Sequence, residues 1–256
     1  FAAGASQPPR YQQAHRQLSR VGAALIIQIY AFQDPEQARE AALLGVDYIG
    51  FVAGDYGLVP GENSFERAKE IVQALPPGKT AVALTMSTSV DEIVRMANAV
   101  RPHVIHISTD MDDVPLPAMR EIRQNLPQGV RLMKAISVTD ESSLAAALHY
   151  AQASDLLLLD TKSTDVAGIG VSGQIHDWNI SRQIVEQAGI PVILAGGISA
   201  ENVAEGIRRV RPFGVDSNTH TNVSGSLVNK DMERIRAFVA AVRAVEKEID
   251  AGLGTG

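Results

Sequence analysis

The sequence predicts an α/β fold, a single (βα)8 TIM barrel in which a parallel eight-stranded barrel is surrounded by outer helices. The chain has 256 residues, close to the roughly 250 residues typical of such barrels. It is 45% hydrophobic and 20% charged, the composition of a globular domain. From residue 25 onward, short apolar runs alternate with amphipathic segments, as in a parallel sheet covered by helices. An open, doubly wound sheet is the alternative.

Eight apolar runs supply the expected strands, at residues 25–30, 48–52, 80–85, 103–107, 130–136, 156–160, 191–195 and 213–216. Capping residues, prolines and apolar stripes mark the helices between them. Asp34 is expected to cap the first helix, with Pro35 at its first position and Gly45 after its end. The later helices are expected from about residue 63 to 75, after Ser89, from Pro115 to before Pro127, from Asp140, over 179–188, from Ser199, and from Met232 to Val245.

The barrel is expected to occupy residues 25–247. Residues 1–24 are expected to form a disordered or loosely helical extension, with organellar targeting as the alternative. Residues 248–256 are expected to be a flexible tail. The longest connections follow the second, sixth and eighth strands, so we expect the functional site at the carboxyl ends of the strands.

Composition excludes several classes of function. The sequence contains no cysteine, which excludes disulfides, thiolate zinc sites and cysteine nucleophiles. A net charge of −6 argues against general nucleic-acid binding. No apolar run approaches the ~18 residues of a membrane span, and the six histidines form no convincing metal-binding set. We expect a cytoplasmic protein without a metal site, either a monomer or a homodimer.

Two segments are candidates for phosphate binding. Gly196 and Gly197 lie between a strand and a helix expected from Ser199, so their N–H groups could approach an anion beside the positive end of the helix. A tight turn that needs glycine for its dihedral angles is the alternative. Asn218 and Thr219 follow the eighth strand and would border the same phosphate, or else form a solvated polar loop.

Asp160 ends a strongly apolar strand and is a candidate general acid. A carboxylate at such a position is partly desolvated, which raises its pKa. A structural contact with Lys162 is the alternative. The glycine-rich segment 168–178 could fold over a ligand, although Trp178 itself is expected to pack on the helix that follows.

His106 is expected to point into the barrel near its catalytic end. His103 lies three positions earlier on the same strand and therefore faces the opposite side. The interior position makes His106 either a candidate base or a histidine whose hydrogen bonds are satisfied inside the core.

Four stretches of the chain carry a family resemblance. They are residues 47–52, then 157–160 followed by Gly173 and 177–178, then 191–197 followed by 201–203, and finally 211–216 followed by 230–231 and 235–238. These stretches resemble the phosphoribosylanthranilate isomerase family, whose members are (βα)8 barrels of tryptophan biosynthesis. The resemblance spans about residues 25 to 245.

The resemblance implies an Amadori rearrangement, an internal aldose-to-ketose redox step on a small phosphorylated sugar derivative that needs no cofactor. In the family, a general acid protonates the ribose ring oxygen and a general base then removes the C2′ proton. Asp160 matches the acid. The family's base is a cysteine after the first strand; the matching residue is Tyr30, and His106 is the other candidate. The substrate pocket is expected to include Gln28, Ser108 and Gly173.

The chain departs from the family pattern at several positions. A tyrosine with a pKa near ~10 is a poor base at pH 7, and a nearby Asp160 carboxylate would raise that pKa further. Residues 54–62 hold no basic residue, where the family has an arginine for the substrate carboxylate. Ser108-Thr109 stands where the family has His-Gly, and Asn218-Thr219-His220 stands where the family has Ser-Ser-Gly. We therefore expect weak or no turnover of phosphoribosylanthranilate. The alternatives are a lyase or epimerase of another sugar phosphate, and a non-catalytic barrel that binds a phosphorylated ligand.

Overall fold

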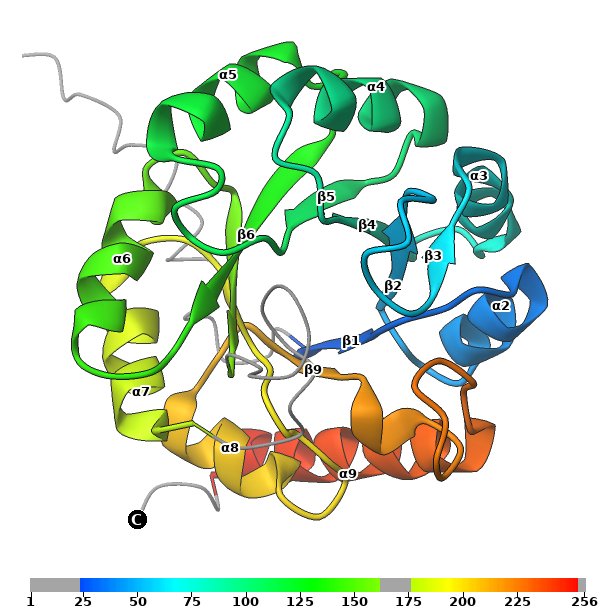
Figure 1. Cartoon of the computed structure of the whole chain (residues 1–256). Helices are drawn as coiled ribbons and strands as arrows, with labels where there is room; N and C mark the ends of the chain where they lie inside the picture. The colour runs from blue at the N-terminus through cyan, green and yellow to red at the C-terminus, as the bar shows by residue number, and fades with distance from the viewer. Residues whose placement is uncertain (1–23, 162–175, 253–256) are drawn as a thin grey trace, which may run out of the picture.

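The computed structural model describes residues 24–161 and 176–252. In this part of the chain, eight parallel strands close into a barrel and helices form a ring around it (Figure 1). The first strand pairs with both the second and the last, which closes the barrel. This confirms the predicted (βα)8 barrel and excludes the open sheet.

The strands lie close to their predicted positions. In barrel order they are β1 (Ile26–Ile29), β2 (Tyr48–Ala53), β4 (Thr80–Thr85), β5 (Val104–Ile107), β6 (Arg131–Ser137), β7 (Leu156–Asp160), β8 (Val192–Leu194) and β9 (Gly214–Ser217). A short strand that the sequence did not predict, β3 (Glu62–Asn63), pairs with β2. The buried Asn63 amide holds it in place by donating to the carbonyl oxygens of Val52 and Phe32 at 3.0 and 3.2 Å.

The helices are α2 (Pro35–Leu43), α3 (Phe65–Ala74), α4 (Val90–Val100), α5 (Leu116–Asn125), α6 (Ser142–Ala151), α7 (Trp178–Gln187), α8 (Val203–Val210) and α9 (Met232–Asp250), with a 3₁₀ turn, η1 (Thr219–Thr221). The predicted cap of α2 is present, because the Asp34 carboxylate accepts the N–H groups of Glu36 and Gln37 at 3.0 and 2.9 Å. None of the described helices combines the length and the apolar character that crossing a membrane requires.

Alternate residues of the strands face two different apolar layers. Ile27 and Ile29 of β1 contact the layer between the strands and the helices. Ile26 and Tyr30 contact the other layer, which fills the barrel together with residues such as Val104. Because side chains alternate along a strand, the polar side chains at the inward-facing positions meet inside the barrel.

Two predicted boundaries are wrong. The helix expected from Ser199 begins at Val203, because residues 199–202 form a turn in which Asn202 Oδ1 accepts the N–H of Ser199 at 2.9 Å. Helix α9 continues to Asp250, so residues 248–250, expected in a flexible tail, are helical. Of the expected extension 1–24, only Ala24 belongs to the described residues, and 253–256 lie outside them as well.

Candidate active site

Polar side chains from four strands converge at the carboxyl end of the barrel interior. Gln28 of β1, His106 of β5, Asp160 of β7 and Asp216 of β9 occupy inward-facing positions, and Tyr30 follows β1 on the same side. Gln28 and Asp216 are paired across neighbouring strands. Asp160 is half-buried and the others are buried. The structure thus brings together the predicted acid, both predicted bases and one predicted pocket residue.

A glycine makes room for the Tyr30 side chain. A Cβ atom on Gly50 of β2 would lie 2.3 Å from the Tyr30 ring, so the ring lies across the inner face of β2. The Tyr30 hydroxyl is 2.9 Å from Nδ1 of His106, and the two groups share a hydrogen bond. His106 therefore points into the barrel, as predicted.

Burial determines the protonation of this pair. It raises the pKa of Tyr30 well above its ordinary value, and the charge of Asp216 adds to the effect. Burial also lowers the pKa of His106 to about 3, helped by the charge of Lys134. The acid that acts on Tyr30 is therefore Asp216, not Asp160 as expected. Both members of the pair are neutral at pH 7, and each is a weak base there.

Asp160 has the acid strength expected of a proton donor. Burial raises its pKa to about 7, against the opposing effect of a hydrogen bond from the Thr161 N–H at 2.7 Å. A carboxyl group with this pKa is partly protonated at neutral pH and can therefore donate a proton. Lys162, the alternative partner, lies outside the described residues.

Asp216 is a titratable residue that the sequence did not single out. It is 6% exposed. Burial raises its pKa to about 8, the charge of Asp160 raises it as well, and Gln28 and Lys230 act in the opposite direction. The charge of one acid, Asp160, thus acts on a second acid, Asp216, inside the same barrel.

Lys230, just before α9, is a second residue that was missed. Its buried Nζ donates to the carbonyl oxygen of Tyr30, to Asn218 Oδ1 at 3.1 Å and to Asn222 Oδ1 at 2.5 Å. Burial lowers its pKa to about 7, while Asp216 opposes that shift. Lys230 therefore ties the end of β1 to the segment that follows β9.

Several buried polar atoms lack a hydrogen-bond partner in the described part of the chain. At inward-facing strand positions they are Nε2 and Oε1 of Gln28, Nε2 of His106, Oγ of Ser137 and Oδ1 of Asp216; elsewhere they are Oγ1 of Thr109 and Nε1 of Trp178. An unpaired buried polar group costs about 1–3 kcal/mol. A cluster of such atoms in one interior indicates a place where a ligand supplies the missing partners.

The two segments predicted to bind phosphate are neighbours. The Ser217 hydroxyl donates to the carbonyl oxygen of Ile198 at 2.7 Å, which joins the ends of β8 and β9. Gly196 and Gly197 have φ values of +77° and +67°. A Cβ atom on Gly196 would also lie 2.6 Å from Thr161 Oγ1, so this turn requires glycine. Among the described residues, none accepts a hydrogen bond from the N–H groups of these glycines.

Ser199, Asn218 and Thr219, the other residues predicted to bind phosphate, differ in their contacts and exposure. The N–H of Ser199 already donates to Asn202, so it is not free for a ligand, while the Ser199 hydroxyl accepts the N–H of Glu201 at 3.3 Å in the turn that leads into α8. Asn218 is half-buried and contacts Lys230, whereas Thr219 is exposed at the start of η1. Asn202 also donates to the carbonyl oxygen of Gly197 at 2.9 Å, which fixes the glycine turn.

Of the remaining residues predicted to line the pocket, Ser108 is described by the structure and Gly173 is not. Ser108 and Thr109 are buried after β5. The carbonyl oxygen of Thr109 accepts a hydrogen bond from Nζ of Lys134 at 2.7 Å. Lys134 lies on the helix-facing side of β6. Gly173, with most of segment 168–178, lies outside the described residues. Trp178 is buried, as a structural residue would be, but it is the first residue of α7 and its ring lies against Gly206 and Arg209 of α8 rather than on the helix that it begins.

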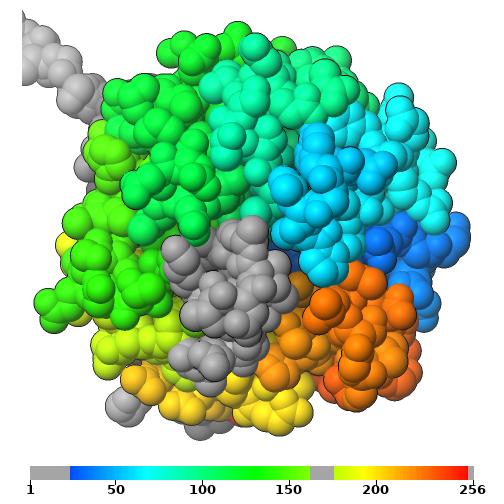
Figure 2. Space-filling model, viewed as in Figure 1, coloured from blue at the N-terminus to red at the C-terminus, as the bar shows by residue number. Residues whose placement is uncertain are grey.

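A carboxylate organises the segment where the resemblance implies an arginine. Glu62 accepts the N–H groups of four successive residues, Tyr56 to Val59, at 2.5 to 2.9 Å. A Cβ atom on Gly61 would lie 3.0 Å from Val228, so this loop contacts the segment before α9. In Figure 2 the two segments lie side by side, in blue to cyan and in orange. They present backbone and apolar groups, such as exposed Leu58, rather than an arginine.

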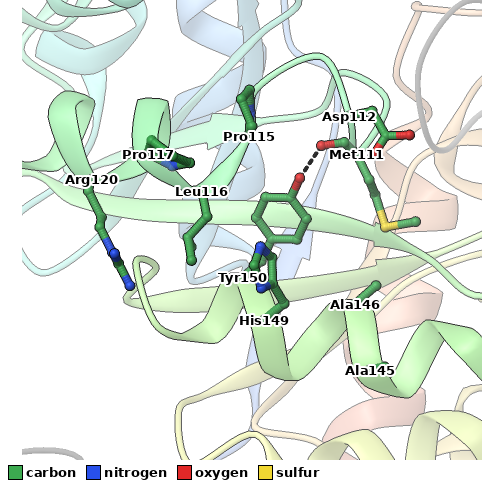
Figure 3. Close-up of a pocket in the computed structure, with 10 residues that line it drawn as sticks. All are labelled: Met111, Asp112, Pro115, Leu116, Pro117, Arg120, Ala145, Ala146, His149 and Tyr150. Atoms are coloured by element: carbon green, nitrogen blue, oxygen red, sulfur yellow. Dashed lines mark hydrogen bonds between the residues drawn. The ribbon is translucent and has the colours of Figure 1, made fainter.

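A separate cavity of about 560 Å³ lies outside the ring of strands, between α5 and α6 (Figure 3). Arg120 and His149 line it, and the Tyr150 hydroxyl donates to the carbonyl oxygen of Met111 at its edge. None of the predicted site residues lines this cavity. Within residues 24–161 and 176–252, no three His, Asp or Glu side chains are grouped to hold a metal ion.

Comparison with known proteins agrees with this geometry. The family described as N-(5'phosphoribosyl)anthranilate (PRA) isomerase matches residues 27–241. The N-(5'-phosphoribosyl)anthranilate isomerase of Methanocella arvoryzae is 33% identical over 220 residues, covering 86% of this chain and 99% of that protein. The enzyme of the same name from Haloferax volcanii is 36% identical over 206 residues, covering 80% and 87%.

Solved structures show the same fold. The phosphoribosyl anthranilate isomerase of Thermotoga maritima superposes with a TM-score of 0.74 at 25% identity, covering 86% of this chain and 99% of that one. A second such isomerase, described in complex with reduced 1-(o-carboxyphenylamino)-1-deoxyribulose 5-phosphate, has a TM-score of 0.69 at 24% identity, with the same coverage.

Proposed function

The chain belongs to the phosphoribosylanthranilate isomerase family, and we propose on that premise that it converts N-(5′-phosphoribosyl)anthranilate to its ketose isomer. The proposal keeps the cytoplasmic location and the monomeric or homodimeric state expected from the sequence. The observation that carries it is the Asp160 carboxyl at the end of β7. Its pKa is raised to about 7, and it faces the same barrel interior as the unpaired polar atoms.

Asp160 is the proposed general acid. Opening the ribose ring breaks the bond between C1′ and the ring oxygen, and that oxygen needs a proton as it leaves. A carboxyl group with a pKa near the working pH is suited to this transfer, which typically contributes about 10²–10⁴-fold to the rate. The anthranilate nitrogen supplies the electron pair that forms the C1′ iminium.

The phosphate is proposed to bind between the ends of β8 and β9. The N–H groups of Gly196 and Gly197 are its donors, and Asn218 and Thr219 border it. Asn202 supports this subsite by fixing the turn from Gly197 to Ser199. Ser199 itself contributes through that turn rather than through a free N–H group.

The rest of the substrate is proposed to lie over the barrel interior. Gln28 offers two unpaired buried polar atoms and His106 offers one, which suits the ribose hydroxyls, and Ser108 borders them. Tyr30 and His106, the predicted bases, form one wall of this pocket through their shared hydrogen bond. The Glu62 loop supplies no cation for the anthranilate carboxylate, so we expect that end of the substrate to be held weakly.

Genetic complementation tests the proposal. A bacterial strain that lacks the isomerase and requires tryptophan is transformed with the wild-type chain or with Asp160→Asn. We expect growth without tryptophan with the wild-type chain and none with Asp160→Asn, at equal protein levels. Absence of growth with soluble, folded wild-type protein would argue for a lyase, an epimerase or a binding protein instead.

A further inference from the structure

The reaction proposed above requires a base as well as an acid. After ring opening, a proton must leave C2′ of the iminium. Tyr30 and His106 are both neutral and bonded to each other, so neither offers a ready proton acceptor at neutral pH. The base must therefore be another group that faces the same interior.

Asp216 has the right position for this role. It lies on β9 opposite Gln28 of β1 and faces into the barrel. Between it and Asp160 of β7, strand β8 ends at Leu194 and is followed by Ala195, whose small side chain faces the same interior. Asp216 is 6% exposed, and its Oδ1 has no hydrogen-bond partner among the described residues. One carboxylate oxygen is thus buried and unpaired, on a residue that faces the barrel interior.

We infer that Asp216 is the general base of this isomerase and that it works as a pair with Asp160. The inference rests on the proposed function. Asp160 gives its proton to the ring oxygen as the C1′–O bond breaks. Asp216 then takes the C2′ proton; the C–H electron pair forms a C1′–C2′ double bond, and the iminium π electrons return to nitrogen. Tautomerisation of the resulting enolamine moves a proton to C1′ and gives the ketose, so no oxidant or reductant is consumed.

The two carboxyls are coupled electrostatically. The charge of Asp160 raises the pKa of Asp216, because two carboxylates that face one interior do not ionise together easily. Asp216, with a pKa of about 8, holds its proton more tightly than Asp160, with a pKa of about 7, so the form in which Asp160 donates and Asp216 accepts is the minor one near neutral pH. The charged or titratable groups that face Asp216 are Asp160 from β7, Tyr30 from β1 and Lys230 from the segment before α9. Lys230 favours the ionised form of Asp216, as a base requires.

The test compares Asp216→Asn with Asp160→Asn and with Asp91→Asn, a matched change on exposed helix α4. We expect Asp216→Asn to lower kcat by about 10²–10⁴-fold while KM stays within about threefold. The wild-type kcat should fall at both low and high pH. Asp216→Asn should lose the low-pH limb and Asp160→Asn the high-pH limb. Asp91→Asn should keep the wild-type kcat and both limbs.

A substrate deuterated at C2′ separates the base from a structural residue. Asp216→Asn should show a larger isotope effect on kcat than the wild type, because proton removal from C2′ becomes slower. Asp160→Asn should show a smaller one, because ring opening becomes slower. If Asp216→Asn fails to fold, Asp216→Glu decides: a turnover retained above about 1% of wild type with both pH limbs supports the base, and complete loss overturns it.

Two negative results are distinguishable. If the wild-type protein turns over the substrate and Asp216→Asn retains kcat within about tenfold, the inference about Asp216 fails while the proposed function stands. If the wild-type protein neither turns over the substrate nor binds reduced 1-(o-carboxyphenylamino)-1-deoxyribulose 5-phosphate, the proposed function fails and the inference with it.

Discussion

The hydroxyl of Tyr30 lies 2.9 Å from Nδ1 of His106, and this contact joins the ends of β1 and β5 inside the barrel. The two rings are tilted, with their centroids 5.6 Å apart. Both side chains are buried, and neither carries a charge near pH 7. Tyr30 stands at the position where the isomerase family has its base, and here it is neutral and hydrogen-bonded to His106.

Tyr30→Phe and His106→Asn, made separately, should each lower kcat by less than about tenfold, because neither residue removes the C2′ proton. Each should lower the free energy of unfolding by about 1–3 kcal/mol, because one buried group loses its partner. Steady-state kinetics and urea unfolding measure the two effects. A loss of about 10³-fold in kcat at unchanged KM in either variant would place the base on that residue instead.

Asp160→Asn should abolish the fall of activity at high pH along with most of the activity. The general acid must be protonated, and its pKa is about 7, so wild-type kcat should decline as the pH rises through that value. A pH series of initial rates with both proteins measures this. A wild-type rate that stays level between about pH 6 and pH 9 would contradict the role of Asp160.

Gly196→Ala should weaken substrate binding and stability together. The residue has φ +77°, and its new Cβ would lie 2.6 Å from Thr161 Oγ1 and 2.9 Å from His176 Nδ1. Gly78→Ala is the matched control, with φ +84° and open space around its Cβ. We expect a loss of about 1–2 kcal/mol for Gly78→Ala from the left-handed backbone alone, and a larger loss for Gly196→Ala. KM should rise only for Gly196→Ala; equal KM values in the two variants would refute the phosphate subsite.

Asp216→Asn should stabilise the fold increasingly as the pH rises. The folded-state pKa of Asp216 is about 8 against an ordinary value of 3.8. The wild-type fold therefore loses stability as the pH rises from about 4 to about 8, where the unfolded chain is ionised and the folded one is not. Asparagine removes this loss. The Tm difference between variant and wild type should be larger at pH 8 than at pH 5, and thermal unfolding at both values measures it.

Much of the fold follows from the sequence. The strand positions were predictable because each strand is a short apolar run, and the cap at Asp34 followed from its side-chain chemistry. The start of α8 was misplaced because Ser199 has the residue type of an N-cap and its hydroxyl does accept the N–H of Glu201, but the backbone becomes helical only at Val203, after a turn held by Asn202. Strand β3 was missed because two polar residues carry no apolar pattern.

The site was only partly predictable. Asp160 stood out because it ends an apolar strand. Asp216 also ends an apolar run, and alternation along β9 from outward-facing Val215 would have placed it inside the barrel. Lys230 lies in a loop without periodicity, so its contact with the carbonyl oxygen of Tyr30, 200 positions away, could not be inferred from local pattern. The protonation of Tyr30 and His106 depends on burial, which sequence alone does not give.

The substrate carboxylate should be bound weakly in this protein. The loop after β2 is folded around Glu62 and holds no basic residue. A charged hydrogen bond of the kind an arginine would supply contributes about 1.5–3 kcal/mol. We therefore expect a KM at least about tenfold above that of a relative that has the arginine, assayed in parallel. Equal KM values would show that another group binds the carboxylate.

The most direct test of the account is the rate at which purified protein forms the ketose from phosphoribosylanthranilate, followed in parallel for the wild type and for Asp160→Asn. We predict product formation by the wild type well above the uncatalysed rate, although slower than in relatives with the cysteine, and a loss of about 10²–10⁴-fold in kcat for Asp160→Asn. A wild-type rate equal to the uncatalysed one at saturating substrate, or an Asp160→Asn rate equal to the wild type, would contradict it.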